Sequence, residues 1–251
     1  MDARQVLAEA RCIAVLTGAG VSAESGVPTF RGSAGMWRHF RPEDLATPEA
    51  FARDPKLCWE WYDWRRGLIA NLHSNPAHHA IAELESRAPA FTLITQNVDG
   101  LHQQAGSKNI LEIHGSIWRL RCTRCRREWN DSSPSLAIPP HCECGGLARP
   151  GVVWFGENLD PKIWSAAQYA ACTCDVLLVV GTSAVVYPAA GLVPLARAAG
   201  AKIIEVNLEA TPLSNSADYC LAGAAGTILP QLLNRQNEPT GQDRNTPTES
   251  A

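Results

Sequence analysis

Thr17-Gly18-Ala19-Gly20-Val21-Ser22-Ala23 follows a short apolar run at residues 12–16 that is typical of a buried strand. Gly18 and Gly20 have no side chains, so the backbone here can approach a pyrophosphate closely, and the small Ala23 allows a following helix to pack on the strand. The pattern G-x-G-x-x-A therefore indicates a dinucleotide-binding turn. Taken alone, it is equally compatible with an ordinary tight turn after a strand.

A second cluster of loop-forming residues, Pro-Thr-Phe-Arg-Gly, continues this segment at residues 28–32. Arg31 could pair with a phosphate, and Phe30 could cover a flat ring and keep water from a reactive bond. A lone aromatic side chain is more often a core residue, so packing is the alternative for Phe30.

The composition limits the class of protein. A chain of 251 residues can form one α/β domain with an insert or two small domains. Its net charge of −3 gives no basic excess for nucleic acid, and no apolar run reaches the roughly 20 residues of a membrane helix. The first residues do not form a secretory signal, so we expect a cytoplasmic protein with no membrane partner.

Three further apolar runs end abruptly in polar loops. They lie at residues 91–95, 176–180 and 202–206. Because ligands of an open parallel sheet bind outside the carboxyl ends of its strands, these loops and the glycine loop should converge on one crevice. Helix-like runs between the strands supply the crossovers, which predicts a doubly wound α/β sheet with helices on both faces.

Residues 49–73 are predicted to be helical, with a break near Asp54-Pro55. At about 100° per residue, one apolar face contains Leu57, Trp61, Trp64, Leu68 and Leu72. Arg65 falls at the edge of that face, beside Tyr62, and should bind an anion or a carbonyl group. The alternatives are an arginine stem that lies along the core, or a pair with Asp63 or Glu60.

Four of the nine cysteines lie in one short window. Cys122 and Cys125 are followed, after sixteen residues, by Cys142 and Cys144, which is the spacing of a structural zinc ribbon. Four sulfur ligands would close the coordination sphere, so the metal would hold an insert together and take no part in chemistry. Because C-x-C is shorter than the usual C-x-x-C, His141 could replace one cysteine.

Two histidines are candidates for a general base. His114, followed by Gly115, ends the run at residues 110–113 and lies directly before the cysteine insert, at the junction between sheet and ribbon. An imidazole near its ordinary pKa suits this role. His102 is the other candidate, and position alone does not separate the two.

In order and spacing these segments resemble the sirtuins, the NAD-dependent protein lysine deacylases. The matching segments are residues 18–22, 26–32, 95–102, 114–115, 150–156, 181–183 and 206–207, together with the four cysteines. The resemblance implies a catalytic domain over residues 1–233, followed by a disordered tail at 234–251. The resemblance divides this catalytic domain into a Rossmann-like NAD domain (1–32, 76–118 and 152–233) and a small domain made of a helical insert (33–75) and a zinc ribbon (119–151).

The resemblance also implies roles for individual residues. His114 would deprotonate the nicotinamide ribose, and the products would be lysine, nicotinamide and O-acyl-ADP-ribose. The residues implied to hold NAD are Gly18, Ala19, Gly20, Ser22, Ala23, Thr29, Phe30, Arg31, Trp37, Gln96, Asn97, Val98, Asp99, Gly181, Thr182, Ser183, Asn207, Leu208, Glu209 and Ala225. Acyl-lysine proteins would bind as extended peptides against Val153, Phe155, Gly156, Glu157 and Val186. One structural zinc would be held by Cys122, Cys125, Cys142 and Cys144.

Tyr62-Asp63-Trp64-Arg65 resembles the Tyr-x-x-Arg motif of class III sirtuins, which meets the carboxylate of a succinyl, malonyl or glutaryl lysine. A buried guanidinium should favour such an acyl group over a neutral acetyl by roughly 1–3 kcal/mol, although acetyl removal remains an expected activity. The departures from the pattern are few. Ala225 stands where some members carry cysteine, and the second cysteine pair is contracted.

Two other functions share part of this pattern. Protein ADP-ribosyl transfer shares the cleavage of NAD, and a deacylase acting mainly on acetyl-lysine shares the whole reaction. A non-catalytic NAD-sensing or nucleic-acid-binding module would call for a strongly basic surface or for substitutions at the catalytic positions, and the sequence has neither. We therefore expect a monomeric deacylase that does not bind nucleic acid directly.

Overall fold

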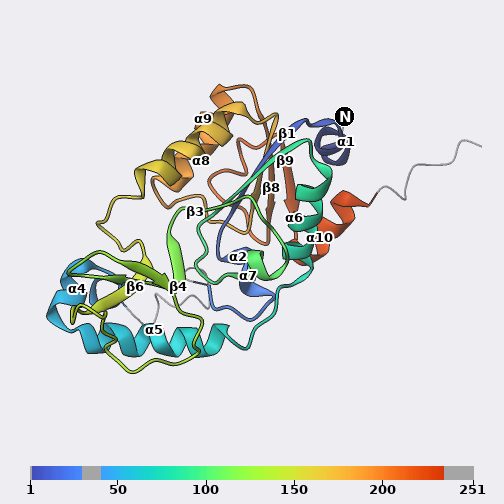
Figure 1. The fold of residues 1–251 in the computed structure, drawn as a ribbon. Coiled ribbons are helices and arrows are strands. Elements are labelled where there is room, and N and C mark those ends of the chain that lie inside the picture. The colour runs from blue at the N-terminus through green and yellow to red at the C-terminus, as the bar shows by residue number, and fades with distance from the viewer. Residues whose placement is uncertain (1, 30–40, 235–251) are drawn as a thin grey trace, which may run out of the picture.

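A computed structural model describes residues 2–29 and 41–234 of the protein. In it, the strand predicted at residues 12–16 lies inside a six-stranded sheet (Figure 1). The strands are β1 (Cys12–Thr17), β2 (Ala90–Thr95), β3 (Ile110–Glu112), β7 (Val176–Val180), β8 (Lys202–Asn207) and β9 (Tyr219–Ala222). All neighbours are parallel, in the order β3-β2-β1-β7-β8-β9. The order reverses between β1 and β7, which is the switch point of a doubly wound, Rossmann-like sheet. The predicted fold class is confirmed.

Helices cover both faces of this sheet, and this explains why β7 is buried at every residue. On one face lie α1 (Ala3–Glu9), α6 (Pro76–Arg87) and α10 (Ala225–Leu233). On the other lie α8 (Pro161–Thr173) and α9 (Leu192–Ala198), the latter preceded by the short helical turn η2 (Ala189–Gly191) (Figure 1). Two short helices, α2 (Gly20–Ala23) and α7 (Leu101–Gln104), begin just after β1 and β2.

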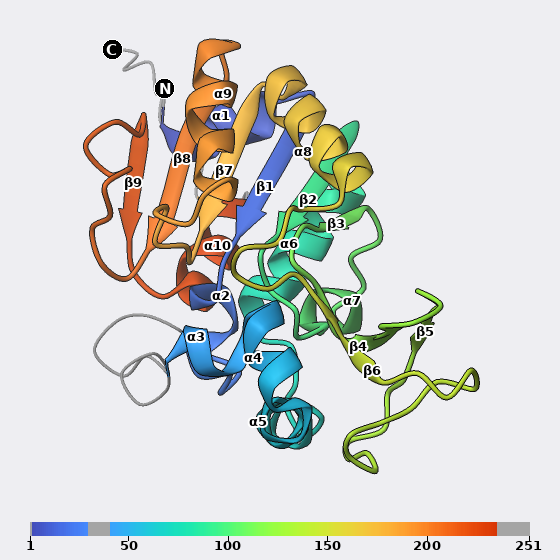
Figure 2. The same cartoon turned by 90° about the vertical axis from the view of Figure 1, so that its left-hand side faces the viewer.

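A second layer lies at the carboxyl end of the parallel strands (Figure 2). It combines the helices α3 (Pro42–Leu45), α4 (Pro48–Arg53) and α5 (Pro55–Ile69) with an antiparallel sheet. The sheet has the order β5-β4-β6 and is formed by β4 (Gly115–Cys122), β5 (Glu128–Asn130) and β6 (Ala148–Val152). Both parts share one hydrophobic cluster that contains the fully buried Trp59. The predicted break at Asp54 is confirmed, because its side chain accepts from the backbone N–H of Leu57 and caps α5.

The predicted apolar face of α5 is wrong. Leu57 and Trp64 are 44% and 48% exposed. The buried residues of α5 are Cys58, Trp59, Trp61, Tyr62, Arg65, Arg66 and Ile69. Hydrogen bonds of Arg66 determine which side of α5 is buried. Its guanidinium donates to the carbonyl oxygens of residues 117, 131 and 133 and to the Asp131 carboxylate. Only a long side chain with several donors satisfies so many acceptors at once, and apolar periodicity does not record that demand.

The helices formed by residues 2–29 and 41–234 include none that is long and apolar enough to cross a membrane. The tail predicted to be disordered, residues 234–251, lies outside the described residues except for Asn234.

Candidate active site

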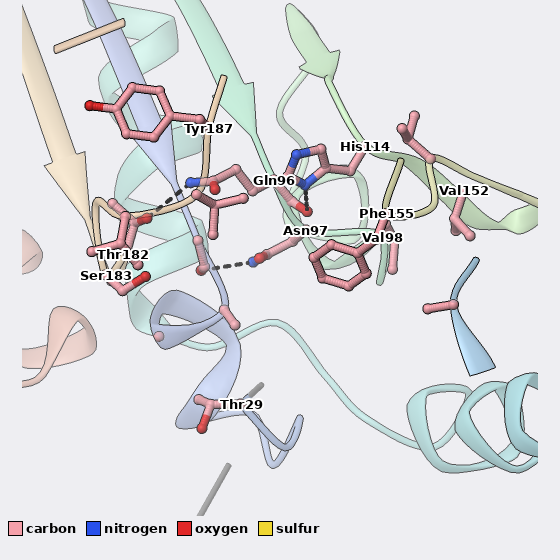
Figure 3. A pocket seen from close by; sticks show the side chains of 18 of the residues that line it. Thr29, Gln96, Asn97, Val98, His114, Val152, Phe155, Thr182, Ser183 and Tyr187 are labelled. Carbon is pink, nitrogen blue, oxygen red and sulfur yellow. Dashed lines mark hydrogen bonds between the residues drawn. The ribbon is translucent and has the colours of Figure 1, made fainter. Parts of the chain in front are cut away.

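A cavity of about 730 Å³ lies where the carboxyl end of the parallel sheet meets the second layer (Figure 3). The loops after β1, β2, β7 and β8 all contribute to its wall, together with α5 and the segment that follows β6. The predicted convergence of the four loops on one crevice is therefore confirmed. Its volume is in the range of small-molecule sites.

The cavity brings most of the predicted site residues together. Its wall contains Gly18, Ala19, Gly20, Ala23, Thr29, Tyr62, Arg65, Gln96, Asn97, Val98, His114, Val153, Phe155, Gly156, Glu157, Gly181, Thr182, Ser183, Val186, Asn207, Leu208 and Glu209. Ser22, Asp99 and Ala225 are buried and do not belong to the wall. Phe30, Arg31 and Trp37 lie outside the described residues. The wall also contains Trp61, Trp154 and Tyr187, which sequence reasoning did not assign.

The glycine loop packs against the loop after β7. A Cβ at Gly20 would lie 2.7 Å from the Gly181 oxygen, and a Cβ at Gly18 would lie 2.8 Å from the Cβ of Thr182. Gly181 has a φ of +57°, and a Cβ there would lie 2.3 Å from the backbone nitrogen of Val21. From the sequence, this close approach was predicted to be to a pyrophosphate. In the structure the glycines let two cavity loops contact each other, and Gly18, Gly20 and Gly181 all belong to the cavity wall.

Asn97 is oriented by groups behind the cavity wall. Its Nδ2 donates to the Gly18 carbonyl (3.0 Å) and to the Ser22 hydroxyl (3.1 Å). Ser22 in turn donates to Asp99 (2.8 Å). Because both amide hydrogens of Asn97 are directed at the protein, its Oδ1 is the atom left to accept a hydrogen bond from a ligand. Ser22 and Asp99 thus act behind the wall, where burial raises the pKa of the Asp99 carboxyl and two hydrogen bonds to its oxygens oppose that rise.

His78 completes this network, although sequence reasoning missed it. Its Nδ1 accepts from the backbone N–H of Asn75 (3.2 Å), so its proton lies on Nε2, which is 3.3 Å from the Ser22 hydroxyl. The Asn75 side chain accepts from the backbone at the start of α6, forming a capping box with His78. The segment Asn75-Pro76 is a recognisable helix start, so a capping search could have located this residue pair.

The two histidine candidates have different environments. His102 is 1% exposed, outside the cavity wall, with its Nε2 3.0 Å from the hydroxyl oxygen of Thr17. His114 lies between β3 and β4 and belongs to the wall. Buried behind the wall, His102 cannot reach a ligand in the cavity, whereas His114 can.

The proton of neutral His114 is located by its neighbour. Its Nδ1 lies 3.1 Å from the Gln96 carbonyl oxygen, which only accepts, so Nδ1 carries the hydrogen and Nε2 keeps its lone pair (Figure 3). Burial lowers the pKa of His114, and the hydrogen bond to Gln96 opposes this in part. Gly115 follows with a φ of +76°, and a Cβ there would lie 2.1 Å from the Gly151 oxygen, so only glycine lets β4 start against β6 at this point.

The buried pair His78 and His102 predicts acid sensitivity. Their rings are 4.8 Å apart, and burial lowers their pKa values to about 4 and about 3, with His79 and His78 respectively adding to the shift. The unfolded chain binds protons at these sites below about pH 6.5, while the folded chain excludes them. The two neutral histidines therefore cost the folded protein no stability above pH 6.5. As the pH falls below 6.5, the free energy of unfolding decreases by up to about 1.4 kcal/mol per pH unit for each histidine.

Urea unfolding at pH 7.5, 6.5 and 5.5 measures this slope. We expect His102→Gln to reduce the slope and to leave the contributions of His78 and His114, whereas His141→Ala, at an exposed position, keeps it. A free energy of unfolding that is constant over this range would contradict the prediction.

Tyr62 and Arg65 form one buried part of the wall. They are 3% and 6% exposed, and the Arg65 guanidinium carbon lies 4.9 Å from the centre of the Trp61 ring. Burial lowers the pKa of Arg65, yet arginine stays protonated in proteins, so the site carries a desolvated positive charge. Of the acids considered above as partners, Asp63 accepts from the Leu136 N–H and Glu60 pairs with Lys56, while Asp99 is the acid whose charge acts on Arg65.

The loop after β8 is held by a buried acid that sequence reasoning missed. Glu205, 3% exposed on β8, accepts hydrogen bonds from the hydroxyls of Thr211 and Ser214. Thr211 itself belongs to the cavity wall, as do Leu208 and Glu209. Glu205 therefore holds the loop that forms this part of the wall. The position of an acidic residue inside an otherwise apolar strand could have indicated this role from the sequence.

The four cysteines form a cluster between the ends of β4 and β6. Their Sγ atoms lie within 4.8 Å of one another, with separations of 3.5 Å for Cys122–Cys144 and 3.8 Å for Cys125–Cys142. A tetrahedral zinc with Zn–S bonds of about 2.3 Å requires S···S separations of about 3.8 Å, so the cluster fits this metal. His141 is not a member of the cluster.

The chain is similar to known proteins over most of its length. A family model described as "Sir2 family" matches residues 18–188. The chain is 53% identical over 234 residues to NAD-dependent protein deacylase 2 of Pyrobaculum aerophilum, covering 93% of this chain and 94% of that protein. It is 47% identical over 260 residues to NAD-dependent protein deacylase sirtuin-5, mitochondrial, of Canis lupus familiaris, covering 92% and 84%.

Solved structures are similar over the same extent. A Sir2 homologue–NAD complex matches with a TM-score of 0.87 and 48% identity, covering 93% of both chains. A Sir2–p53 peptide–NAD+ complex matches with a TM-score of 0.80 and 31% identity, covering 91% of this chain and 95% of the other.

Proposed function

Because this chain belongs to the Sir2 family, it is an NAD-dependent protein deacylase, and we propose that it acts preferentially on lysines that carry an acidic acyl group such as succinyl, malonyl or glutaryl. The observation that carries the proposal is the desolvated Arg65 guanidinium, which lines the cavity together with Tyr62. A carboxylate pairs with guanidinium through charge-assisted hydrogen bonds, and a neutral acetyl group offers no such charge. The similarity to NAD-dependent protein deacylase sirtuin-5 supports the deacylase activity.

One part of the cavity wall is proposed to bind NAD. When bound, NAD supplies the nicotinamide–ribose bond whose cleavage drives transfer of the acyl group. We propose that the glycine loop, Gln96, Asn97 and the loops after β7 and β8 hold it. His114 then accepts the ribose hydroxyl proton at Nε2, because its Nδ1 is protonated and directed at Gln96. The nicotinamide and O-acyl-ADP-ribose that leave are the expected products.

We propose that the substrate protein binds as an extended peptide at the opposite side of the wall. Phe155 and Gly156 follow β6 in the segment that reaches from His114 to α3, since the Val153 N–H donates to the His114 carbonyl and the Phe155 N–H to the Ala46 carbonyl. The p53 peptide bound to a Sir2 relative supports this binding mode. Such a mode uses mainly backbone groups and reads little sequence around the lysine.

We also propose the domain division and the setting in which the enzyme acts. The NAD domain comprises residues 1–32, 76–118 and 152–233, and the small domain comprises 33–75 and 119–151. The protein acts as a monomer in the cytoplasm, without a nucleic-acid partner.

The test of the acyl preference is Arg65→Met. We expect the wild-type protein to have a higher kcat/KM on a succinyl-lysine peptide than on the same peptide with acetyl-lysine. In Arg65→Met the succinyl-to-acetyl ratio should fall by roughly 10- to 100-fold, because a hydrogen-bonded charge pair is lost. Arg53→Met, at an exposed arginine of the same helical region, is the matched control. An acetyl preference that Arg65→Met leaves unchanged would make Arg65 structural and overturn the proposed preference, while deacylation itself would stand.

A further inference from the structure

The Tyr62 hydroxyl has a fixed neighbour within the protein. The Trp154 indole Nε1 lies 2.9 Å from the Tyr62 oxygen, and both side chains are 3% exposed. An indole N–H can only donate, so the tyrosine oxygen accepts. The single hydrogen of the hydroxyl must therefore be directed away from the indole. Tyr62 and Trp154 both belong to the cavity wall, so a group inside the cavity is the acceptor that our proposal assigns to this hydrogen.

Trp154 is itself held on several sides. The guanidinium carbon of Arg149 lies 3.4 Å from the centre of its ring, and the ring of Phe51 lies 5.2 Å away. Arg149, 6% exposed, donates to both carboxylate oxygens of Glu157, at 2.6 and 2.8 Å. Glu157 also accepts from the backbone N–H of Trp154 at 2.9 Å. The indole therefore has little freedom to turn, and its N–H remains directed at Tyr62.

We propose that Trp154 is a positioning residue for the recognition of acidic acyl groups, because its indole N–H occupies the Tyr62 oxygen as an acceptor and commits the Tyr62 hydroxyl to donate into the cavity. This inference rests on the proposed function. A hydroxyl without this neighbour could rotate and present its lone pairs to an incoming carboxylate, which is repulsive. With the neighbour, only the donating orientation is favourable. Burial raises the pKa of Tyr62 to about 12, so the hydroxyl keeps its hydrogen at neutral pH.

The consequence is a difference between acyl groups. A carboxylate at the end of the acyl chain accepts the Tyr62 hydrogen bond, whereas the methyl end of an acetyl group does not. Loss of the indole N–H should therefore act on the succinyl substrate and much less on the acetyl one. A purely structural role of Trp154 would lower the kcat/KM of both substrates by the same factor, which makes the ratio the informative quantity.

The experiment is a double-mutant cycle on the intact protein with NAD. It measures kcat and KM on one peptide carrying succinyl-lysine or acetyl-lysine, for the wild type, Trp154→Phe, Tyr62→Phe and the double variant. Trp59→Phe is the matched control, because Trp59 lies in the same hydrophobic cluster and donates from its indole to the Ala148 carbonyl (2.8 Å) without lining the cavity. Thermal unfolding of each variant reports on folding separately.

We expect Trp154→Phe to lower the succinyl-to-acetyl ratio of kcat/KM about 3- to 10-fold, mainly through KM for the succinyl peptide. In the Tyr62→Phe background the same change should have no further effect on the ratio, since no hydroxyl is left to orient. Trp59→Phe should lower thermal stability and leave the ratio unchanged.

Two results would overturn the inference while the proposed function stands. One is a ratio that falls in Tyr62→Phe and Arg65→Met but not in Trp154→Phe. The other is a Trp154→Phe effect that adds in full to that of Tyr62→Phe. If neither Tyr62→Phe nor Arg65→Met changes the ratio, the acyl preference itself is wrong, and the inference falls with it.

Discussion

Replacing His114 with alanine is expected to lower kcat/KM for deacylation by about 10²- to 10⁴-fold, the usual contribution of a general base. The reason is geometric. Among the residues that the structure describes, His114 is the histidine of the cavity wall, and the Gln96 carbonyl holds its proton on Nδ1, which leaves Nε2 to accept a proton from a ribose hydroxyl. Steady-state assays with a succinyl-lysine peptide and NAD measure the effect.

The pH profile makes this prediction sharper. Burial lowers the pKa of His114, so its neutral, basic form persists to lower pH than for a free imidazole. We therefore expect the acid limb of kcat/KM in the wild type to have its midpoint below pH 6.5, and activity to be lost as the pH falls through it. His141→Ala, at an exposed position on the ribbon, is the control and should keep full activity. A His114→Ala protein that retains more than a tenth of the wild-type kcat/KM would exclude the general-base role.

Replacing Cys142 with serine is expected to abolish stoichiometric zinc and to disrupt the small antiparallel sheet. Cys142 is buried, and its Sγ lies 3.8 Å from that of Cys125, so its loss opens the tetrahedral set. Binding of structural zinc contributes apparent free energies of about 10–16 kcal/mol in small zinc domains, and folding of the ligand loops depends on it. Elemental analysis gives the zinc content, and thermal unfolding gives the stability.

Loss of this zinc should also reduce activity, although none of the four cysteines lines the cavity. The β6 strand begins just after the cluster and leads directly to Val153, whose N–H binds the His114 carbonyl. Disorder in the ribbon therefore reaches the cavity wall through one continuous strand. Cys172→Ser, at an exposed cysteine of α8, should retain zinc, stability and activity. Retention of one zinc per chain in Cys142→Ser would contradict the four-cysteine assignment, and its loss on further replacement of His141 would identify the histidine as a ligand.

Several features of this protein could be predicted because they are local in sequence. The apolar runs identify the strands, and the polar residues directly after them, such as Gln96 and Ser183, must lie at the carboxyl edge of a parallel sheet. The cysteine spacing likewise specifies a metal cluster, because two short thiolate pairs can close around one ion with little demand on the rest of the chain. His114 was placed correctly at the junction, but only as one of two candidates.

Other features depend on partners that are distant in sequence. Trp154 and Tyr62, whose side chains are hydrogen-bonded, are 92 positions apart, and Ser22 and Asp99 are 77 apart. Apolar periodicity placed Trp64 in the core of α5 and Arg65 at its edge, yet Trp64 is half-exposed and Arg65 is buried. A period describes how apolar a face is. It contains no information about which carbonyl or hydroxyl will meet that face.

The sequence alone thus determined the parallel sheet, the loops at its carboxyl edge, the cysteine cluster and the pair of residues proposed to read the acyl group. The resemblance implied His114 as the base, and the tertiary structure alone decided which side of α5 is buried and which hydrogens of Asn97 and His114 are already used within the protein. The physical reason is that strands and metal ligands follow from short-range patterns of side-chain type. The orientation of a buried polar group is set by the donors and acceptors that folding brings within about 3 Å of it.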